Sequence, residues 1–243
     1  MRSPFENMPP VVKNLLIINI LCFLPSLFYS RNFADPGFDP VASMFGVYYF
    51  DSLLFKPWQL VTYMFLHGGW AHILFNMFAL YSFGTAIEYI MGSKRFFNFY
   101  FICGFGAIAL QMLVQAIEVH GVTGNFTLAN TQLDESYLQY GQAAAAKLYG
   151  IYNTPMVGAS GAIFGLLIAF GMIYPNAELM IMFIPVPVKA KYIIPVYVLL
   201  ELSLGFAQFS GDSVAHFAHL GGAIIGFILV KVWHLQGPKN YYN

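Results

Sequence analysis

The sequence has few charged residues, and this scarcity limits the class of protein that it can encode. Lysine, arginine, aspartate and glutamate together make up 9% of the 243 residues, with 11 basic and 11 acidic side chains. In a soluble domain, roughly a quarter of the residues are charged. The low content argues against a soluble globular protein. The balanced net charge also excludes the basic surface typical of nucleic-acid binding, so we expect no nucleic-acid partner.

Cysteine is scarce too, because the chain has only Cys22 and Cys103. Both fall in segments expected to be apolar, so we interpret them as small buried residues rather than a disulfide, and no cysteine pattern indicates a metal site. A removable signal peptide is not evident. Residues 11–30 have a long apolar core, a weak basic region before it and no obvious small-residue cleavage site, which favours a retained membrane span.

Apolar residues, by contrast, are abundant: 58% of the chain is hydrophobic and 18% is aromatic. Several runs approach 20 residues, which is long enough to cross a bilayer as a helix. We therefore expect an all-α membrane protein, a six-transmembrane-helix bundle formed by a single domain. The predicted spans are residues 11–30, 70–91, 96–117, 156–174, 192–209 and 214–233.

The segments between these spans have different compositions. Residues 31–70 combine prolines, glycines and aromatics and suggest an irregular interfacial first loop. Residues 118–155 are polar and predict an extramembrane loop with room for a short helix, to which we assign no function. Residues 179–188 contain two prolines and are too short to span, so we place them at the interface. The domain organisation is then an N-terminal segment 1–10, a membrane domain 11–234 and a C-terminal tail 235–243.

Six spans put both termini on one side of the membrane, and most basic residues fall on that side. The positive-inside rule makes this side cytoplasmic. The second, fourth and sixth spans then enter from the outer side, and each carries polar side chains within its first two turns: His72 and Asn76, Ser160, and His216 and His219. Polar groups inside a bilayer usually face a cavity or one another, so we expect these helices to bring them together at one depth.

These residue types suit acyl transfer. Ser160 lies between Gly158 and Gly161, which leave its hydroxyl open to close approach. A neutral imidazole, His219, could accept the serine proton and return it to a leaving group. His72 and Asn76 are spaced to share one helix face and could donate hydrogen bonds to an oxyanion, together with the backbone N–H of Ser160. No carboxylate stands near either histidine in sequence, so we expect a two-residue catalytic unit.

Other interpretations of these residues stay open. Ser160 could simply hydrogen-bond within its own helix, beside a small-residue packing notch. His216 could be the base, although His219 is favoured because Gly222 and Gly226 clear a groove on its side. A metal site is disfavoured because no glutamate or cysteine accompanies the histidines at ligand spacing. Glu201 is an intramembrane carboxylate that we expect to hydrogen-bond a neighbouring helix.

Three motifs occur in order along the chain and together resemble the rhomboid family of intramembrane serine proteases. They are Trp58 followed by His67-Gly68-Gly69-Trp70-Ala71-His72 and Asn76, then Gly158-Ala159-Ser160-Gly161, then Ala218-His219-Leu220-Gly221-Gly222 with Gly226. The resemblance covers roughly residues 55–230. It implies a serine endopeptidase without cofactor or metal, in which Ser160 is the nucleophile, His219 the general base and acid, and His72 and Asn76 oxyanion donors. It also implies single-span membrane-protein substrates cleaved near the outer face.

Two positions depart from the family pattern. Gln59 stands where relatives often have arginine, so any role of a charge there in holding the first loop is in doubt. Phe164 stands where relatives often have tyrosine, so the ring can pack under the histidine but offers no hydroxyl.

Two functions of other classes were considered. A non-catalytic rhomboid-like protein that binds membrane clients usually lacks the serine or the histidine, and both are present. A channel or transporter using Glu201 and the histidines would be expected to have an internal repeat, and none is evident. For localisation, we expect an integral multi-pass protein of a bacterial plasma (inner) membrane with both termini cytoplasmic.

Overall fold

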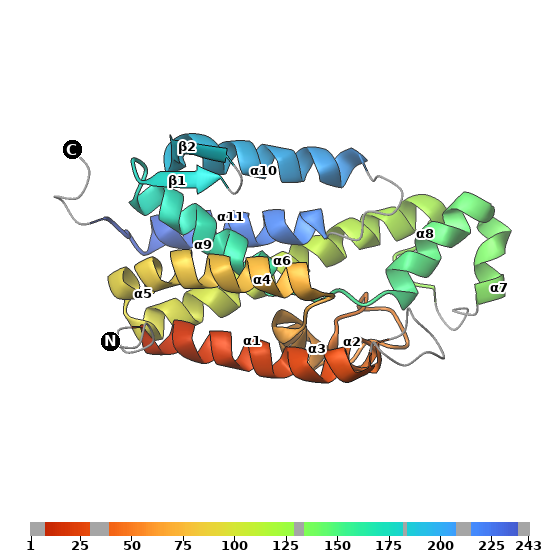
Figure 1. The fold of residues 1–243 in the computed structure, drawn as a ribbon. Helices are drawn as coiled ribbons and strands as arrows, with labels where there is room; N and C mark the ends of the chain where they lie inside the picture. Colours follow the sequence, from red (N-terminus) through yellow and green to blue (C-terminus); the bar gives the residue numbers. More distant parts are fainter. Residues whose placement is uncertain (1–7, 30–38, 129–133, 182–183, 208–214, 238–243) are drawn as a thin grey trace.

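The structure, a computed structural model, is a helical bundle with a small lobe at one end (Figure 1). It describes residues 8–29, 39–128, 134–181, 184–207 and 215–237. The long helices are α1 (Pro10–Tyr29), α4 (Trp70–Ala79), α5 (Thr85–Met91), α6 (Ser93–Thr123), α8 (Gln142–Asn153), α9 (Ser160–Ile173), α10 (Ala190–Ala207) and α11 (His216–Val232). The short elements are α2 (Pro40–Phe45), α3 (Gln59–Thr62), η1 (Tyr63–Phe65), η2 (Leu80–Gly84), α7 (Asp134–Tyr137), η3 (Leu138–Tyr140), β1 (Glu178–Ile181) and β2 (Ile184–Lys189).

The helical membrane bundle expected from the sequence is confirmed. Among the described residues, four helical stretches are long and apolar enough to cross a bilayer: Pro10–Phe28, Trp70–Met91, Ser93–Thr123 and Ala190–Ala207. The second of these joins α4 to α5 through η2, a single π-helical stretch. Helices α9 and α11 are apolar but shorter, with 14 and 17 residues. Both of these shorter helices begin at a polar residue, Ser160 and His216.

The starts of α9 and α11 differ from the predicted ones. Helix α9 begins at Ser160 itself, four residues later than expected, because Gly158 has a φ of +136°, which no helix accommodates. Met156 instead forms an isolated bridge with Val47 of the first loop. Helix α11 begins at His216, and the predicted start at Val214 lies outside the described residues. Ser160 and His216 therefore open their helices rather than lying inside them.

Glycines bring the backbones of α9 and α11 into direct contact. A β-carbon on Gly222 would collide with the carbonyl of Gly161, and one on Gly226 would lie 2.7 Å from the Cα of Gly165. The groove predicted beside His219 is thus confirmed, and α9 fills it. On its other side α9 meets α6, where a β-carbon on Gly165 would lie 2.8 Å from Cβ of Cys103. Since α9 is packed on both flanks, Ser160 has little freedom to move relative to α11.

Glu88 ties three helices together near the beginning of α1. Its carboxylate accepts hydrogen bonds from the backbone N–H groups of Val11 and Val12, at 3.0 and 2.7 Å, and from the hydroxyl of Ser93 at 2.7 Å. Amides in the first turn of a helix have no acceptor within the helix and favour a negative charge. The carboxylate of Glu88 therefore caps the start of α1.

The two ends of the bundle carry different features (Figure 1). The described parts of both terminal regions lie at one end, and α7 and α8 lie at the other. Helices α4, α9 and α11 all begin at the α8 end, as expected from the alternation of spans. The starts of α1, α6 and α10 and the end of α11, which together carry most of the described basic residues, lie at the terminal end. The assignment of that end to the cytoplasm stays a prediction.

The polar segment 118–155 contains more regular structure than expected. Helix α6 extends to Thr123, and α8 adds twelve residues of helix. This lobe is fastened to the first loop: Tyr49 donates to the carbonyl of Phe126 at 2.8 Å, and Tyr152 donates to Asp51 at 2.9 Å. Burial, with the Asp51 charge nearby, raises the pKa of Tyr49 to about 12, so this phenol keeps its proton at neutral pH. The lobe and the first loop form one packed unit.

The apolar segment that we place at the interface contains two strands, β1 and β2. Strands β1 and β2 pair in antiparallel fashion, with Glu178 opposite Lys189 and Met180 opposite Pro187. Proline has no N–H to donate, and an edge strand of a two-stranded sheet tolerates this. The all-α description therefore omits one hairpin. Both cysteines are free, Cys103 buried and Cys22 partly so.

The glycine contact between α9 and α11 predicts the effect of one added methyl group. Gly226→Ala should lower the free energy of unfolding by about 1–3 kcal/mol, because the new Cβ meets backbone atoms of Gly165 that cannot move aside. Thermal melting in detergent measures the change. Gly121→Ala, also on a helix but with open space around it, is the control and should leave stability unchanged or slightly raised. Equal effects of the two substitutions would contradict the packing described here.

Candidate active site

The first loop positions the chain that leads into Ser160. Val47 and Met156 exchange two backbone hydrogen bonds, at 2.9 and 2.8 Å, and the N–H of Gly158 donates to the carbonyl of Tyr63 at 2.9 Å. These bonds hold the residues just before α9 against the first loop as a short extended segment. Ser160 is the first residue of α9, where a backbone N–H has no acceptor within the helix and the helix dipole is positive.

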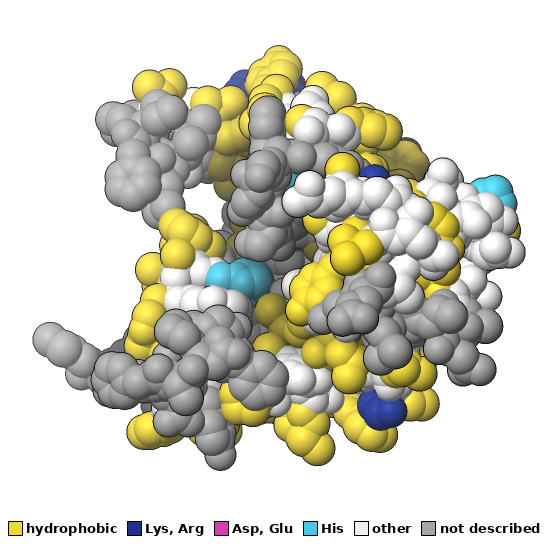
Figure 2. Space-filling model, turned by 90° about the vertical axis from the view of Figure 1, so that its right-hand side faces the viewer, with side chains coloured by type: hydrophobic (Ala, Val, Ile, Leu, Met, Phe, Trp, Pro, Cys, Tyr) yellow, Lys and Arg dark blue, Asp and Glu magenta, His cyan; other side chains and the backbone are white. Residues whose placement is uncertain are grey.

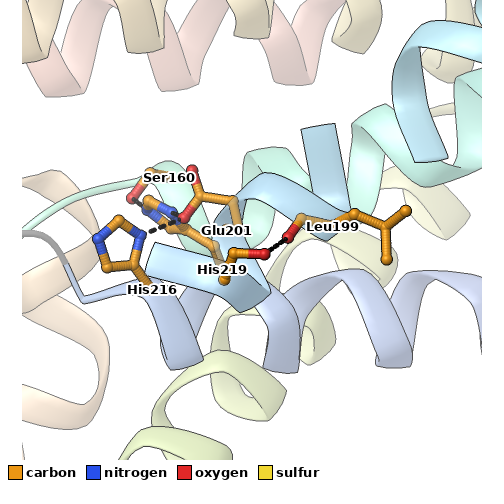
Figure 3. A network of polar contacts seen from close by, with 6 residues as sticks. Ser160, Leu199, Glu201, His216 and His219 are labelled. Carbon is orange, nitrogen blue, oxygen red and sulfur yellow. Dashed lines mark hydrogen bonds and ion pairs between the residues drawn. The ribbon is translucent and has the colours of Figure 1, made fainter. Parts of the chain in front are cut away.

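Ser160 and His219 are in direct contact (Figure 3). The distance between Ser160 Oγ and His219 Nε2 is 2.7 Å. Phe164, one turn after the serine, stacks on the imidazole with ring centroids 4.4 Å apart and an angle of 7° between the planes. The ring packing expected at this position is therefore present without the phenol hydroxyl. The stacking fixes the plane of the imidazole so that Nε2 faces the serine.

A carboxylate binds the other side of the His219 ring, and the sequence did not lead us to expect it there. Glu201 of α10 places Oε2 2.8 Å from Nδ1 of His219 and 2.6 Å from Nδ1 of His216 (Figure 3). All three side chains are buried. Because an ionised carboxylate only accepts hydrogen bonds, both Nδ1 atoms carry a proton, and a neutral His219 then presents an unprotonated Nε2 to Ser160. The network selects the tautomer in which Ser160 donates to His219.

Gly205 explains how Glu201 reaches α11. Gly205 lies one turn after Glu201 on the same face of α10, and a β-carbon there would lie 3.2 Å from Cβ of His216 and 3.3 Å from the ring of Phe217. The absence of a side chain lets α10 approach the beginning of α11. Glu201 was expected to hydrogen-bond a neighbouring helix, and the partner proves to be this histidine pair.

The two histidines of α11 have different neighbours. His219 contacts Ser160 through Nε2, whereas His216 hydrogen-bonds to Glu201. The geometry therefore favours His219 over His216 as the group that accepts the serine proton. The two rings lie at 89° to each other, with centroids 6.3 Å apart.

His72 and Asn76 lie on α4, which contacts α9. The N–H of Gly68 donates to Nδ1 of His72 at 3.3 Å, so the remaining proton of a neutral ring is on Nε2. A β-carbon on Gly158 would lie 2.9 Å from His72 Nε2 and 3.4 Å from Ser160 Oγ. Both atoms thus border the space that the glycine leaves empty, and His72 presents an N–H donor to it.

Asn76 is buried, and its side-chain amide nitrogen has no hydrogen-bond partner among the described residues. Buried amide donors are nearly always satisfied, since leaving one unmade costs about 1–3 kcal/mol. An unsatisfied donor one turn below His72 is consistent with a site that receives an oxygen atom from outside the protein.

Gln59 holds the first loop by hydrogen bonds where relatives often have a charge. It is buried, its Oε1 accepts from the N–H of Lys56 at 2.9 Å, and its Nε2 donates to the carbonyls of Leu54 and Met44 at 3.1 and 3.4 Å. A neutral amide therefore connects three points of the loop, and no charge is needed for this.

The end of the bundle that carries α7 and α8 is seen face-on in Figure 2. The surface is hollowed near its middle, and a histidine side chain borders the hollow. Around it the described side chains are mostly apolar, with few lysines or arginines. Helices α4, α9 and α11 all begin on the side of the bundle that faces this end.

Comparisons with known proteins agree with the motifs. A family model described as a rhomboid domain matches residues 54–236. The chain is 30% identical to RHOMBOID-like protein 4 of Arabidopsis thaliana and 31% identical to rhomboid protease GluP of Bacillus subtilis, over 77% and 70% of its length. It is 29% identical to rhomboid protein 1, mitochondrial, of Saccharomyces cerevisiae, over 70% of its length. The matched regions are 37%, 25% and 40% of these three relatives, so the chain spans less than half of each.

The backbone at Gly158 predicts how sensitive the cluster is to one methyl group. Gly158→Ala should slow the reaction of Ser160 with a fluorophosphonate probe by roughly tenfold or more, because a φ of +136° strains alanine by about 1–3 kcal/mol and the new Cβ displaces His72. Labelling rates of the purified protein in detergent measure this. Gly150→Ala, in open space on α8, is the control. An unchanged rate in Gly158→Ala would mean that His72 and Gly158 do not shape the reacting site.

Proposed function

The chain belongs to the rhomboid family, and from this premise and the geometry of its polar cluster we propose that it is an intramembrane serine endopeptidase. The observation that carries the proposal is the 2.7 Å contact between Ser160 and His219, at a site where a carboxylate fixes the imidazole tautomer. A serine hydroxyl is a poor nucleophile unless a base accepts its proton, and this contact supplies one.

In the first step Ser160 attacks the carbonyl carbon of a substrate peptide bond. As the Oγ–C bond forms, the hydroxyl proton passes to Nε2 of His219. The ring becomes an imidazolium, and the carboxylate of Glu201, which accepts the Nδ1–H, stabilises the new charge. Buried in low dielectric, this interaction is stronger than it would be in water.

The substrate carbonyl oxygen becomes an oxyanion in the same step. Three donors surround the position that we assign to it: Nε2–H of His72, the amide of Asn76 and the backbone N–H of Ser160. Donors held in place before the reaction stabilise developing charge without reorganisation, and one such donor is commonly worth about 3–4 kcal/mol. Asn76 would gain in this step the partner that it otherwise lacks.

The remaining steps reverse the proton transfer. His219 gives its proton to the leaving amine as the C–N bond breaks, which leaves an ester on Ser160. A water then loses a proton to His219 and attacks the ester, and the serine is regenerated when the proton returns to Oγ. The chemistry uses only side chains and water, so we propose that it needs no cofactor.

The substrates that fit this site are single-span membrane proteins. The starts of α4, α9 and α11 lie at the end of the bundle opposite to the terminal regions, and basic residues favour the terminal end as cytoplasmic. Cleavage would therefore occur near the outer face of the membrane. We retain a bacterial plasma membrane as the location, and residues 11–234 as the membrane domain between segments 1–10 and 235–243.

The nucleophile and base can be tested together with a fluorophosphonate activity probe. Wild-type protein in detergent should be labelled, and Ser160→Ala and His219→Ala should each lose the label while melting at the wild-type temperature. His216→Asn, which keeps an N–H donor toward Glu201, should keep it. Absence of labelling in a folded wild type would favour a non-catalytic rhomboid-like protein that binds membrane clients.

Glu201 should matter through its charge. Glu201→Gln keeps the shape and a hydrogen-bond acceptor but cannot stabilise the imidazolium, so kcat for a transmembrane substrate should fall roughly 100-fold with KM nearly constant. Cleavage kinetics in liposomes measure both. Ser203→Ala is the matched control on α10, since Ser203 is exposed and its hydroxyl donates to the carbonyl of Leu199 in the same helix. A rise in KM alone would place Glu201 in substrate binding instead.

A further inference from the structure

Glu201, His216 and His219 have the composition of a metal site. One ligand atom from each of the three side chains lies within 4.8 Å of the ligand atoms of the other two. Two imidazoles and one carboxylate are a common ligand set for Zn²⁺. In the sequence no carboxylate lies at ligand spacing from the histidines, and our expectation of no metal used that argument. The fold supplies the carboxylate from α10.

We propose that Zn²⁺ binds Glu201 Oε2, His216 Nδ1 and His219 Nδ1, and that this binding reversibly inhibits the protease. The two Nδ1 atoms already point at one oxygen, at 2.6 and 2.8 Å. Tetrahedral zinc with bonds of about 2.0–2.2 Å needs its ligand atoms roughly 3.3 Å apart. Each Nδ1 atom therefore has to move roughly half an ångström or more away from Oε2, a change that small side-chain rotations provide.

Charge and burial favour the metal. The cluster brings an anionic carboxylate against two imidazoles in a place where all three side chains are buried. An uncompensated buried charge is costly, and a divalent cation compensates it more fully than hydrogen bonds from neutral rings do. A water or hydroxide can take the fourth position, because zinc sites with three protein ligands commonly keep one open.

Inhibition follows from the position of one proton on His219. Without metal, Nδ1 carries the ring proton and Nε2 is free to accept the proton of Ser160. When Nδ1 binds zinc, a neutral ring carries its proton on Nε2, so the atom facing Ser160 becomes a donor and cannot act as a base. The proton moves from one ring nitrogen to the other through solvent, and no electron is transferred. Metal binding and base function therefore exclude each other.

His216 separates the two activities. It is a ligand in the metal-bound form, yet in the metal-free form its hydrogen bond goes to Glu201 rather than to Ser160. His216→Asn keeps an N–H donor near the Nδ1 position and removes the metal ligand. This variant should cleave substrate at a rate close to that of wild type and resist zinc.

The first experiment measures cleavage of a transmembrane substrate in liposomes at free Zn²⁺ concentrations set by a chelator buffer. Wild type should be inhibited by zinc and should recover fully on chelation. His216→Asn should need at least about tenfold more zinc for the same inhibition, because removing a group that supports a bound metal commonly lowers the metal affinity about tenfold or more. Equal inhibition of wild type and His216→Asn would overturn the proposal.

The inhibitory effect rests on the proposed function, so a second experiment measures binding without proteolysis. Ser160→Ala, which cannot cleave, should bind one Co²⁺ per chain with the visible absorption of a four-coordinate site, and adding His216→Asn or Glu201→Gln should abolish that absorption. A protein that binds Co²⁺ in this way but never cleaves would refute the protease and keep the metal site. A protein that cleaves but binds no Co²⁺ in this cluster would refute the metal site and keep the protease.

Discussion

The direct backbone contact between α9 and α11 is the constraint on which the candidate site depends. Gly161 and Gly165 of one helix face Gly222 and Gly226 of the other, and no side chain separates the two backbones. In lipid, helices gain little from hydrophobic burial against each other, so close van der Waals packing of this kind contributes much of the stability of their association. With α6 closing the other flank of α9, Ser160 and His219 meet at hydrogen-bond distance.

A second constraint concerns polar groups that have no water around them. Such a group is costly to leave without a partner, and the structure supplies partners both from within the first loop and from elements far away in the sequence. Glu88 satisfies the amides that begin α1, Gln59 connects three points of the first loop, and the lobe at Asp51 and Tyr152 holds that loop in place. The first loop in turn holds Met156 and Gly158. The extended entry to Ser160 is therefore stabilised by a chain of contacts that starts well outside the bundle.

These observations explain which parts of the site could be predicted from the sequence. The apolar spans, the polar starts of three helices and the glycine groove are local patterns, and the structure has them. The partner of His219 was not predictable, because it depends on how α10 is rotated about its axis and how closely Gly205 lets it approach α11. The same holds for the role of Glu88. Its partners are backbone amides of α1, which every helix presents whatever its side chains are. The late start of α9 likewise follows from one backbone angle at Gly158 and from a bridge to Val47, which no periodicity of the segment encodes.

The position of a single proton on His219 connects these features. Glu201 holds the proton on Nδ1, Phe164 fixes the plane of the ring, and the packing of α9 on α11 places Ser160 at the nitrogen that is left free. His72 is arranged in the opposite sense: the amide of Gly68 occupies its Nδ1, so its proton is directed from Nε2 toward the space beside Ser160. Two histidines that look alike in sequence thus become an acceptor and a donor through their hydrogen-bond partners alone. A cation at Glu201 would reverse the tautomer of His219 and leave that of His72 unchanged, because His72 is fixed by a backbone group that the cation does not touch.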